Sequence, residues 1–292
     1  MGKANFTPSN VGNHGGDIPK PPPLPGRSGA PQQAGIAPRT VRFRKPDRGR
    51  GLKTGIYGPG GIGKTSLAAM APGPVVFFDL DRSLGVLDLD VDIIEDIHTW
   101  ADLRSALQGD GWDGVRTIVI DSVTKAEEMA IAHTLETVRH EKGMLVTSIE
   151  GYGFGKGVQH VFGTFLPLLA DLDRHVMAGR NVILIAHDCT ETVPNPAGDD
   201  YIRYEPRLQS PKSGKASIRH RFREEMDNLW FIGYDVIAKD NKGVGSGTRT
   251  IYPTEQPHCM AKSRTIQEPI EYIPGIDPVW HLIFNKEKSN VG

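Results

Sequence analysis

The stretch GIYGPGGIGKTSLAAM, residues 55–70, contains two overlapping phosphate-binding patterns. Gly58, Gly60 and Gly63 have the G-x-G-x-x-G spacing of a dinucleotide-binding turn. Residues 58–65 also match G-x-x-x-x-G-K-T, the P-loop of nucleoside triphosphatases. Both patterns need a strand before them and a helix after them, so residues elsewhere in the chain must decide between the two cofactors.

Short apolar segments on either side of this motif indicate a mostly parallel sheet. They are rich in β-branched residues and alternate with segments of helical character, which is typical of buried strands joined by helical crossovers. The sequence therefore predicts an α/β fold in three layers, extended after residue 227 by a β-hairpin whose turn is KGVGSG, residues 242–247. The expected strands are 52–57, 74–80, 116–121 and 181–187, the expected helices are 64–70, 99–108 (capped by Thr99), 122–140 and 157–178, and LWFIGYDVIA, TRTIYPT and PHCMAK form the late β segments.

Polar residues follow three of these strands at their carboxyl ends, where parallel sheets bind ligands. They are Asp79 and Asp81 after the second strand, Asp121 after the third and His187 after the fourth. A nicotinamide cofactor would use one of the first two carboxylates on its ribose and would leave Asp121 without a role. A nucleoside triphosphate with Mg²⁺ accounts for all of these positions.

In that interpretation Lys64 contacts the β- and γ-phosphates, Thr65 ligates Mg²⁺ through its hydroxyl, and Asp121 holds the ion from the opposite side. Hard oxygen ligands of this kind suit Mg²⁺. The sequence therefore predicts Mg-ATP as the cofactor, with metal ligands Thr65 and Asp121. The expected nucleotide-binding residues are Gly58, Pro59, Gly60, Gly61, Ile62, Gly63, Lys64, Thr65 and Ser66.

The position after Asp121 separates two classes of P-loop protein. It is Ser122, whereas the broad AAA+ class usually has a water-activating Glu there. RecA-type cores instead place a carboxylate at the end of the strand that follows the P-loop helix, and Asp81 is the better candidate here.

Residues from about 50 to 285 resemble the RecA-core nucleotide-binding proteins of bacteriophages, which include single-strand-annealing recombinases related to RecA. The resemblance rests on GPGGIGKTSLA, FFDLDRSLG, TIVIDSVTKAEE, GYGFGKG, NVILIAHD, EEMDNLWFI and MAKSRT, in that order. It implies a three-layer RecA-like P-loop core, with Asp81 as the base and His187 as a sensor of the γ-phosphate. The family usually has Glu at position 81, and the shorter Asp implies either slow hydrolysis or a different carboxylate in this role. A structural role for His187 remains the alternative.

The same resemblance places single-stranded DNA on the loops after the metal-binding helix and after the sensor strand, residues 141–157 and 188–225. From Arg203 to Arg223 the chain has seven Lys or Arg against Glu205 alone. The intervening Gly and Ser favour a mobile backbone, and an aromatic residue (Tyr201, Tyr204 or Phe222) would stack on bases. A solvated charged surface is the alternative. The candidate DNA-binding residues are Lys156, Lys212, Lys215, Arg219, Arg221 and Arg223.

RecA-type proteins act as rings or filaments in which cations of one subunit reach the γ-phosphate of its neighbour. Lys262 and Arg264 fit this role if AKSRT is a strand, because alternate residues of a strand share one face. They would then act in catalysis with Lys64, Asp81, Asp121 and His187. Exposed charges that protect an edge strand from aggregation are the alternative interpretation.

The N-terminal 53 residues differ in composition from the rest. They carry ten Lys or Arg against two Asp, although the net charge of all 292 residues is −1. Residues 1–45 are rich in Pro and Gly and are expected to be a disordered basic arm preceding an ATPase domain over residues 46–288. No apolar run approaches the roughly 20 residues of a membrane helix, and two cysteines without C-x-x-C spacing suggest reduced thiols. A cytoplasmic protein is expected.

Taken together, the sequence predicts a P-loop ATPase that binds and anneals single-stranded DNA with Mg-ATP in phage recombination or replication. Its expected partners are DNA, further copies of itself and a single-strand DNA-binding protein. A helicase or translocase motor is one alternative, which directional unwinding would select. A small-molecule phosphotransferase is another, and DNA-stimulated ATP turnover would exclude it.

Overall fold

The computed structural model describes residues 40–45, 49–239 and 242–284. Residues 40–45 are exposed, form neither helix nor strand, and belong to a unit that spans Met1–Pro46. The other described residues belong to the unit Asp47–Gly292. The basic arm expected over residues 1–45 lies, apart from residues 40–45, outside the described residues, so the expected division of the chain stays a prediction.

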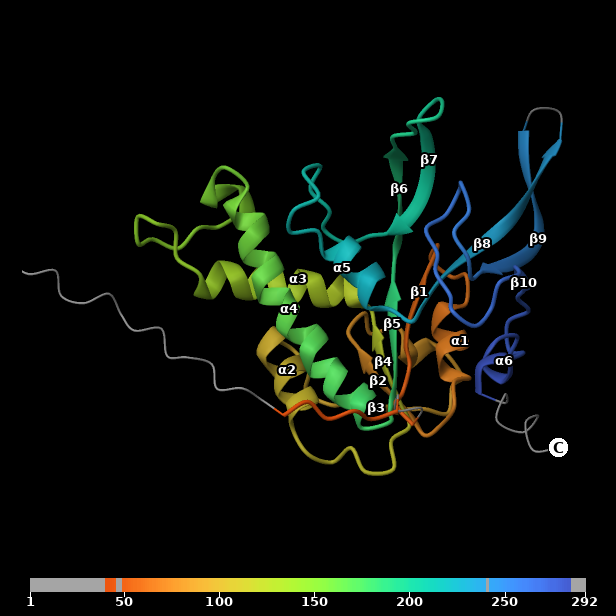
Figure 1. Ribbon diagram of the computed structural model, residues 1–292, viewed down its shortest axis with the longest axis horizontal. Coiled ribbons are helices and arrows are strands. Elements are labelled where there is room, and N and C mark those ends of the chain that lie inside the picture. The colour runs from red at the N-terminus through yellow and green to blue at the C-terminus, as the bar shows by residue number, and fades with distance from the viewer. Residues whose placement is uncertain (1–39, 46–48, 240–241, 285–292) are drawn as a thin grey trace, which may run out of the picture. The chain divides into compact units, whose positions relative to one another are not determined.

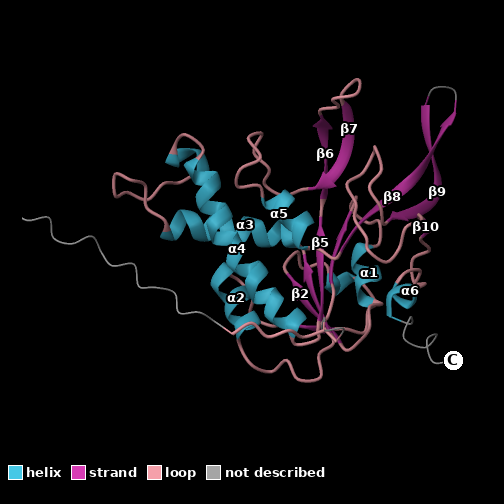
Figure 2. Ribbon diagram, in the orientation of Figure 1, coloured by secondary structure: helices cyan, strands magenta, loops and turns pink. Residues whose placement is uncertain are grey.

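A mostly parallel sheet forms the centre of the larger unit (Figures 1 and 2). Six of its strands run parallel in the order β8-β1-β5-β4-β2-β3, and two further strands, β9 and β10, add antiparallel beyond β8. The strands are β1 Lys53–Tyr57, β2 Val75–Asp79, β3 Asp92–Ile93, β4 Thr117–Asp121, β5 Asn181–Ala186, β8 Asn228–Lys239, β9 Lys242–Tyr252 and β10 Ile270–Glu271.

Helices cover both faces of this sheet, because its central strands are apolar on both sides. Successive residues of a strand point to opposite faces, so Ile118 and Ile120 join one buried cluster and Val119 joins the other. Figure 1 shows α2, α3 and α4 on one side of the sheet and α1 and α6 on the other. The helices are α1 Lys64–Ala69, α2 Trp100–Gln108, α3 Val123–Thr137, α4 Lys156–Met177, α5 Ile218–Glu225 and α6 Trp280–Phe284, with short 3₁₀ turns η1 Leu84–Val86 and η2 Ile149–Tyr152.

These observations confirm the α/β class and the mostly parallel sheet predicted from the sequence, and they are consistent with a RecA-like P-loop fold. The expected C-terminal hairpin is β8 and β9. Its turn was placed wrongly: β9 begins at Lys242, so residues 242–247 are strand. Glycine-rich sequence suggests a turn, but residues 242–245 pair with β8, and the positive φ of Gly247 (83°) falls at an irregularity of the pairing.

The segment 188–225 is also more ordered than its composition suggested. It contains the antiparallel pair β6 Asp188–Val193 and β7 Tyr201–Pro206, followed by α5. Residues 257–262, expected to be a strand, form only isolated bridges to Tyr204, Leu229 and Gln256. Figure 1 shows β6 and β7 projecting from the end of β5, so this hairpin continues from the carboxyl edge of the sheet.

Candidate nucleotide-binding site

The loop between β1 and α1 has the backbone that the P-loop motif requires. Gly58, Gly61 and Gly63 have φ angles of 151°, 70° and 103°, a region that disfavours side chains. A Cβ on Gly58 would stand 2.2 Å from the Ile232 carbonyl oxygen of β8. The glycines therefore allow both the left-handed turns and the close approach of β8.

Lys64 lies inside this loop and is buried. Its ammonium Nζ donates hydrogen bonds to the carbonyl oxygens of Gly58 (2.7 Å) and Pro59 (2.8 Å). Burial lowers the pKa of Lys64, and the carboxylates of Asp121, Asp188 and Asp81 partly oppose that effect. An anion in the loop would therefore meet a cation that is already desolvated.

Thr65 and Asp121 meet at the carboxyl edge of the sheet, as the metal-site prediction requires. The Thr65 hydroxyl donates to Asp121 Oδ2 over 2.6 Å. Burial raises the pKa of Asp121 to about 6, and the hydrogen bond from Thr65 works against that rise. Both are hard oxygen donors, and among the described residues no cluster of three His, Cys, Asp or Glu could hold a metal by itself. This set fits Mg²⁺, which binds through one or two protein ligands, phosphates and water.

Asp81 and His187 form a second polar pair at the same edge. His187 Nε2 lies 3.1 Å from Asp81 Oδ2. The hydrogen bond from His187 holds the pKa of Asp81 below its ordinary value despite partial burial. Asp79 is committed elsewhere, because its two oxygens accept the N–H groups of Ser83 (2.8 Å) and Leu84 (3.1 Å). Asp81 is thus the carboxylate with an oxygen directed toward the site.

The order of the strands explains why these groups converge. β5 lies between β1 and β4, so His187, which directly follows β5, stands between the P-loop and Asp121. Ser122, the residue in place of a carboxylate, accepts a hydrogen bond from the N–H of Lys125 and caps α3. The structure therefore brings together Lys64, Thr65, Asp81, Asp121 and His187.

A chain of contacts connects His187 to the basic segment. The N–H of Arg207 donates to the His187 carbonyl oxygen (2.8 Å). The Thr124 hydroxyl accepts from the N–H of His187 (3.1 Å) and donates to the Arg207 carbonyl oxygen (3.4 Å). Two residues further on, the N–H of Gln209 donates to Glu127 Oε1 (2.7 Å), and burial raises the pKa of Glu127 to about 7.

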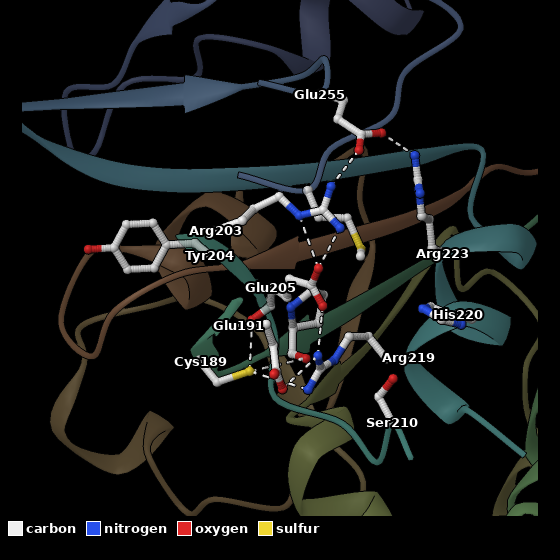
Figure 3. A network of polar contacts seen from close by, with 12 residues as sticks. Cys189, Glu191, Arg203, Tyr204, Glu205, Ser210, Arg219, His220, Arg223 and Glu255 are labelled. Atoms are coloured by element: carbon white, nitrogen blue, oxygen red, sulfur yellow. Dashed lines mark hydrogen bonds and ion pairs between the residues drawn. The ribbon is translucent and has the colours of Figure 1, made fainter. Parts of the chain in front are cut away.

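Arg219 is not placed to meet DNA in this structure (Figure 3). Its buried guanidinium donates to Glu205 (2.7 Å) and Glu191 (2.9 Å), and Arg203 also pairs with Glu205. This corrects the expectation for Arg219, because a cation packed at the base of β6 and β7 serves that ion cluster. Arg223 pairs with Glu255, Arg221 with Glu224 and Glu225, and Lys156 with Glu141.

Lys212 and Lys215 are the exposed members of the predicted DNA-binding set for which no ion pair is found among the described residues. Both lie in the loop between β7 and α5. Sequence composition alone could not show that Lys212 and Lys215 are unpaired and Arg219 is paired, because the partners of Arg219 lie on β6 and β7.

Lys262 and Arg264 do not share one strand face, which corrects the geometry expected for them. Lys262 bridges Leu229, and its Nζ donates to the carbonyl oxygens of Arg223 (3.2 Å) and Glu224 (3.1 Å). Arg264 is exposed, lies in a bend and approaches Asp227 at 3.9 Å, at the amino end of β8. Arg264 thus stands at the edge of the sheet opposite its own P-loop.

Three further residues with unusual environments are absent from the set of site residues predicted from the sequence. Phe154 is fully exposed and has a φ of 47°, and its neighbours Gly153 and Gly155 also have positive φ angles. Arg249 and Tyr272 donate hydrogen bonds to the carbonyl oxygens of P-loop residues. The glycines in GYGFGKG are the one signal that could have revealed the Phe154 turn.

These features define the site of a P-loop nucleoside triphosphatase. The AAA domain family matches residues 50–265, and the chain belongs to this family. No curated protein matches the chain. Among solved structures, the flagellar accessory protein FlaH from Methanocaldococcus jannaschii is similar at 11% identity and a TM-score of 0.39, over 79% of this chain and 88% of FlaH. No helix in the described part of the chain has the length and apolar character needed to cross a membrane.

Asp81→Asn should lower ATP turnover about 100-fold or more while ATP affinity stays within about twofold, because loss of a general base affects the chemical step. Turnover and equilibrium nucleotide binding are measured on the same preparations. Asp79→Asn is the matched control: it removes one acceptor of the Ser83–Leu84 turn and should cost about 1 kcal/mol of stability instead. Parental turnover in Asp81→Asn would show that another group activates the water.

Glu127→Gln should remove a pH dependence of stability. The pKa of Glu127 is raised in the folded protein, so its contribution is fully present below about pH 4.5 and is lost as the pH rises through about 7. The variant should be about 2–3 kcal/mol more stable than the parent at pH 8 and equal to it at pH 4, as measured by denaturant unfolding. Glu128→Gln, at the exposed neighbouring position, should show no such crossover.

Proposed function

We propose that this P-loop ATPase binds single-stranded DNA in a manner controlled by Mg-ATP. The observation that carries the proposal is the position of His187. Its side chain meets Asp81 at the nucleotide site, and its backbone pairs with Arg207 at the start of the basic loop. A change at the γ-phosphate position would therefore move the segment that carries Lys212 and Lys215.

These two lysines and Phe154 supply contacts of the kind that single strands need. Exposed cations attract phosphates without reading sequence, and an exposed aromatic ring stacks on any base. Phe154 stands before α4, and Gln209 of the basic loop donates to the carbonyl oxygen of Val158 in the first turns of that helix (3.0 Å). The two segments are therefore neighbours.

Each residue of the nucleotide site has a defined task in this proposal. Lys64 would exchange the carbonyl oxygens of Gly58 and Pro59 for phosphate oxygens, and Thr65 and Asp121 would hold the ion. Mg²⁺ supplies charge neutralisation on the phosphates when it is bound. Asp81 takes the proton of the attacking water, and His187 reports the loss of the γ-phosphate to the basic loop.

The resemblance to phage RecA-core proteins supports a role in annealing during recombination or replication, in the cytoplasm of an infected host. ATP would favour the DNA-bound form and hydrolysis would release it. A single-strand DNA-binding protein is the partner expected to present the strand.

Replacing Lys212 and Lys215 together by Gln should weaken single-stranded DNA binding and flatten its salt dependence. Two lost phosphate contacts reduce the slope of log K against log salt by about 1.4. Phe154→Ala should weaken binding by about 1–3 kcal/mol at every salt concentration, with the slope unchanged. Fluorescence anisotropy with a labelled oligonucleotide, in ADP and in a non-hydrolysable ATP analogue, measures both effects.

The matched control for the lysine pair is Arg116→Gln with Arg174→Gln. These exposed arginines lie just before β4 and near the end of α4, at the opposite edge of the sheet, so the charge change is equal and the DNA contacts should survive. If the parent protein binds no single-stranded DNA in any nucleotide state, the proposal is wrong. Unwinding with a fixed polarity would replace annealing by motor activity.

A cavity beside Asp81 supports a second candidate function, transfer of phosphate to a small molecule. It has a volume of about 430 Å³ and is lined by Asp79, Asp81, Arg82, His98 and Lys125 among others. This volume is in the range of ligand sites, and the cationic side chains of Arg82 and Lys125 suit an anionic group of the acceptor. ATP turnover that DNA does not stimulate, with phosphate recovered on an added small anionic acceptor, would favour this function.

We also propose that Arg264 completes the nucleotide site of a neighbouring copy, since it is exposed and stands far from its own P-loop. Arg264→Ala and Lys64→Ala should each be nearly inactive in ATP turnover. Their mixture should regain part of the activity, because an intact P-loop can meet an intact Arg264; a finger of this kind is worth about 10³-fold or more. No gain in the mixture, with subunit exchange verified by a fluorescent label, would leave Arg264 as an edge charge.

A further inference from the structure

Two successive carbonyl groups of the P-loop are held by side chains from the C-terminal strands. Arg249 of β9 donates from Nη1 to the Ile62 carbonyl oxygen over 2.9 Å. The Tyr272 hydroxyl, one residue past β10, donates to the Gly63 carbonyl oxygen over 2.8 Å. Neither residue belongs to the phosphate-binding motif, and both lie about 200 positions away along the chain.

Peptide planarity makes these contacts relevant to phosphate binding. In a trans peptide the C=O of one residue and the N–H of the next lie in one plane and point in opposite directions. Fixing the carbonyl of Ile62 therefore aims the N–H of Gly63, and fixing the carbonyl of Gly63 aims the N–H of Lys64. Neither N–H has a hydrogen-bond partner within the described part of the chain, so both are free to donate to a phosphate.

Both side chains are themselves held in place. The N–H of Tyr272 donates to the Arg249 carbonyl oxygen (2.7 Å), and the Tyr272 ring is buried. The Arg249 guanidinium lies 5.6 Å from the centre of the Tyr234 ring of β8. Burial raises the pKa of Tyr272 to about 12, so its hydroxyl keeps the proton that it donates. The pair is thus a rigid donor unit on the antiparallel edge of the sheet.

We propose that Arg249 and Tyr272 are positioning residues that hold the Ile62–Gly63 and Gly63–Lys64 peptides in the orientation that binds the phosphates of the nucleotide. The motif supplies glycines that can adopt this backbone, and it does not by itself keep them there. Gly63 has a φ of 103°, and its Cβ position is filled by the Tyr272 hydroxyl at 2.7 Å. Residues on and next to the C-terminal strands β9 and β10 thereby set nucleotide affinity without touching the nucleotide.

Lys64 makes this support necessary. Before a phosphate arrives, its ammonium group is bound to the carbonyl oxygens of Gly58 and Pro59 on the first half of the loop. When Lys64 turns to the phosphates, those two contacts are lost. The second half of the loop keeps its shape, because its restraints come from outside the loop.

The test measures binding of a fluorescent ATP analogue and of ADP, with Mg²⁺, to the full chain. Tyr272→Phe removes one hydroxyl and keeps the packed ring, and it should weaken both nucleotides about three- to tenfold, the worth of one hydrogen bond. Arg249→Met should weaken them by a similar factor. Arg249→Lys should restore part of the affinity, because an ammonium group can still donate to the Ile62 carbonyl. When ATP turnover is measured over a range of ATP concentrations, kcat should change less than KM in all three variants.

Tyr152→Phe is the matched control. Tyr152 is also buried, and its hydroxyl donates to the carbonyl oxygens of Thr134 (3.1 Å) and Val138 (2.7 Å), at the far end of α3. Its loss should lower the melting temperature as much as Tyr272→Phe does and leave nucleotide affinity unchanged. Parental nucleotide affinity in folded Tyr272→Phe and Arg249→Met would overturn the proposal, as would an equal loss of affinity in Tyr152→Phe.

Discussion

The hydrogen bond from the Thr65 hydroxyl to the Asp121 carboxylate joins the two halves of the site, and parallel pairing makes it possible. β1 and β4 are each hydrogen-bonded to β5 in register, so they end at the same edge of the sheet. α1 begins directly after the P-loop and brings Thr65 back over that edge. If the strand order were different, Thr65 would still lie in α1 and Asp121 at the end of β4, but the two side chains would no longer be close to each other.

Burial acts against the charges of this site while no ligand is bound. It lowers the pKa of Lys64 and raises that of Asp121, so each group is driven toward its neutral form. A triphosphate brings negative charge to Lys64, and its cation brings positive charge to Asp121. Binding therefore favours the ionised forms that burial disfavours, and it should stabilise the folded chain by linkage. The same desolvation makes each new contact electrostatically stronger than it would be in water.

The sequence predicted the parts of the fold that depend on local pattern. The buried strands, the helices between them and the Thr99 cap, which forms a capping box with Asp102, all appear in the structure. The residues at the strand ends converge, because parallel topology follows from alternating strands and helices. What failed depended on partners far along the chain. Nothing within residues 242–247 indicates that the first four of them pair with β8, and nothing within 203–223 indicates that Glu191 and Glu255 pair with its arginines.

The ion cluster at the base of β6 and β7 shows what the basic segment gains from those distant acids. Arg203, Arg219 and Arg223 pair with Glu191, Glu205 and Glu255, so the charges of the cluster balance. Its buried members are Arg203, Glu205 and Arg219. Removing one partner of such a cluster would leave a buried charge uncompensated, which is more costly than the cluster is stabilising. The cluster thus fixes the hairpin relative to α5. Among the described residues of the segment, the cations without an ion pair are Arg207, whose backbone contacts His187, and Lys212 and Lys215 in the loop that follows. The loop is joined to the nucleotide edge of the sheet at two points, because the N–H of Arg207 donates to the His187 carbonyl oxygen and the N–H of Gln209 donates to Glu127.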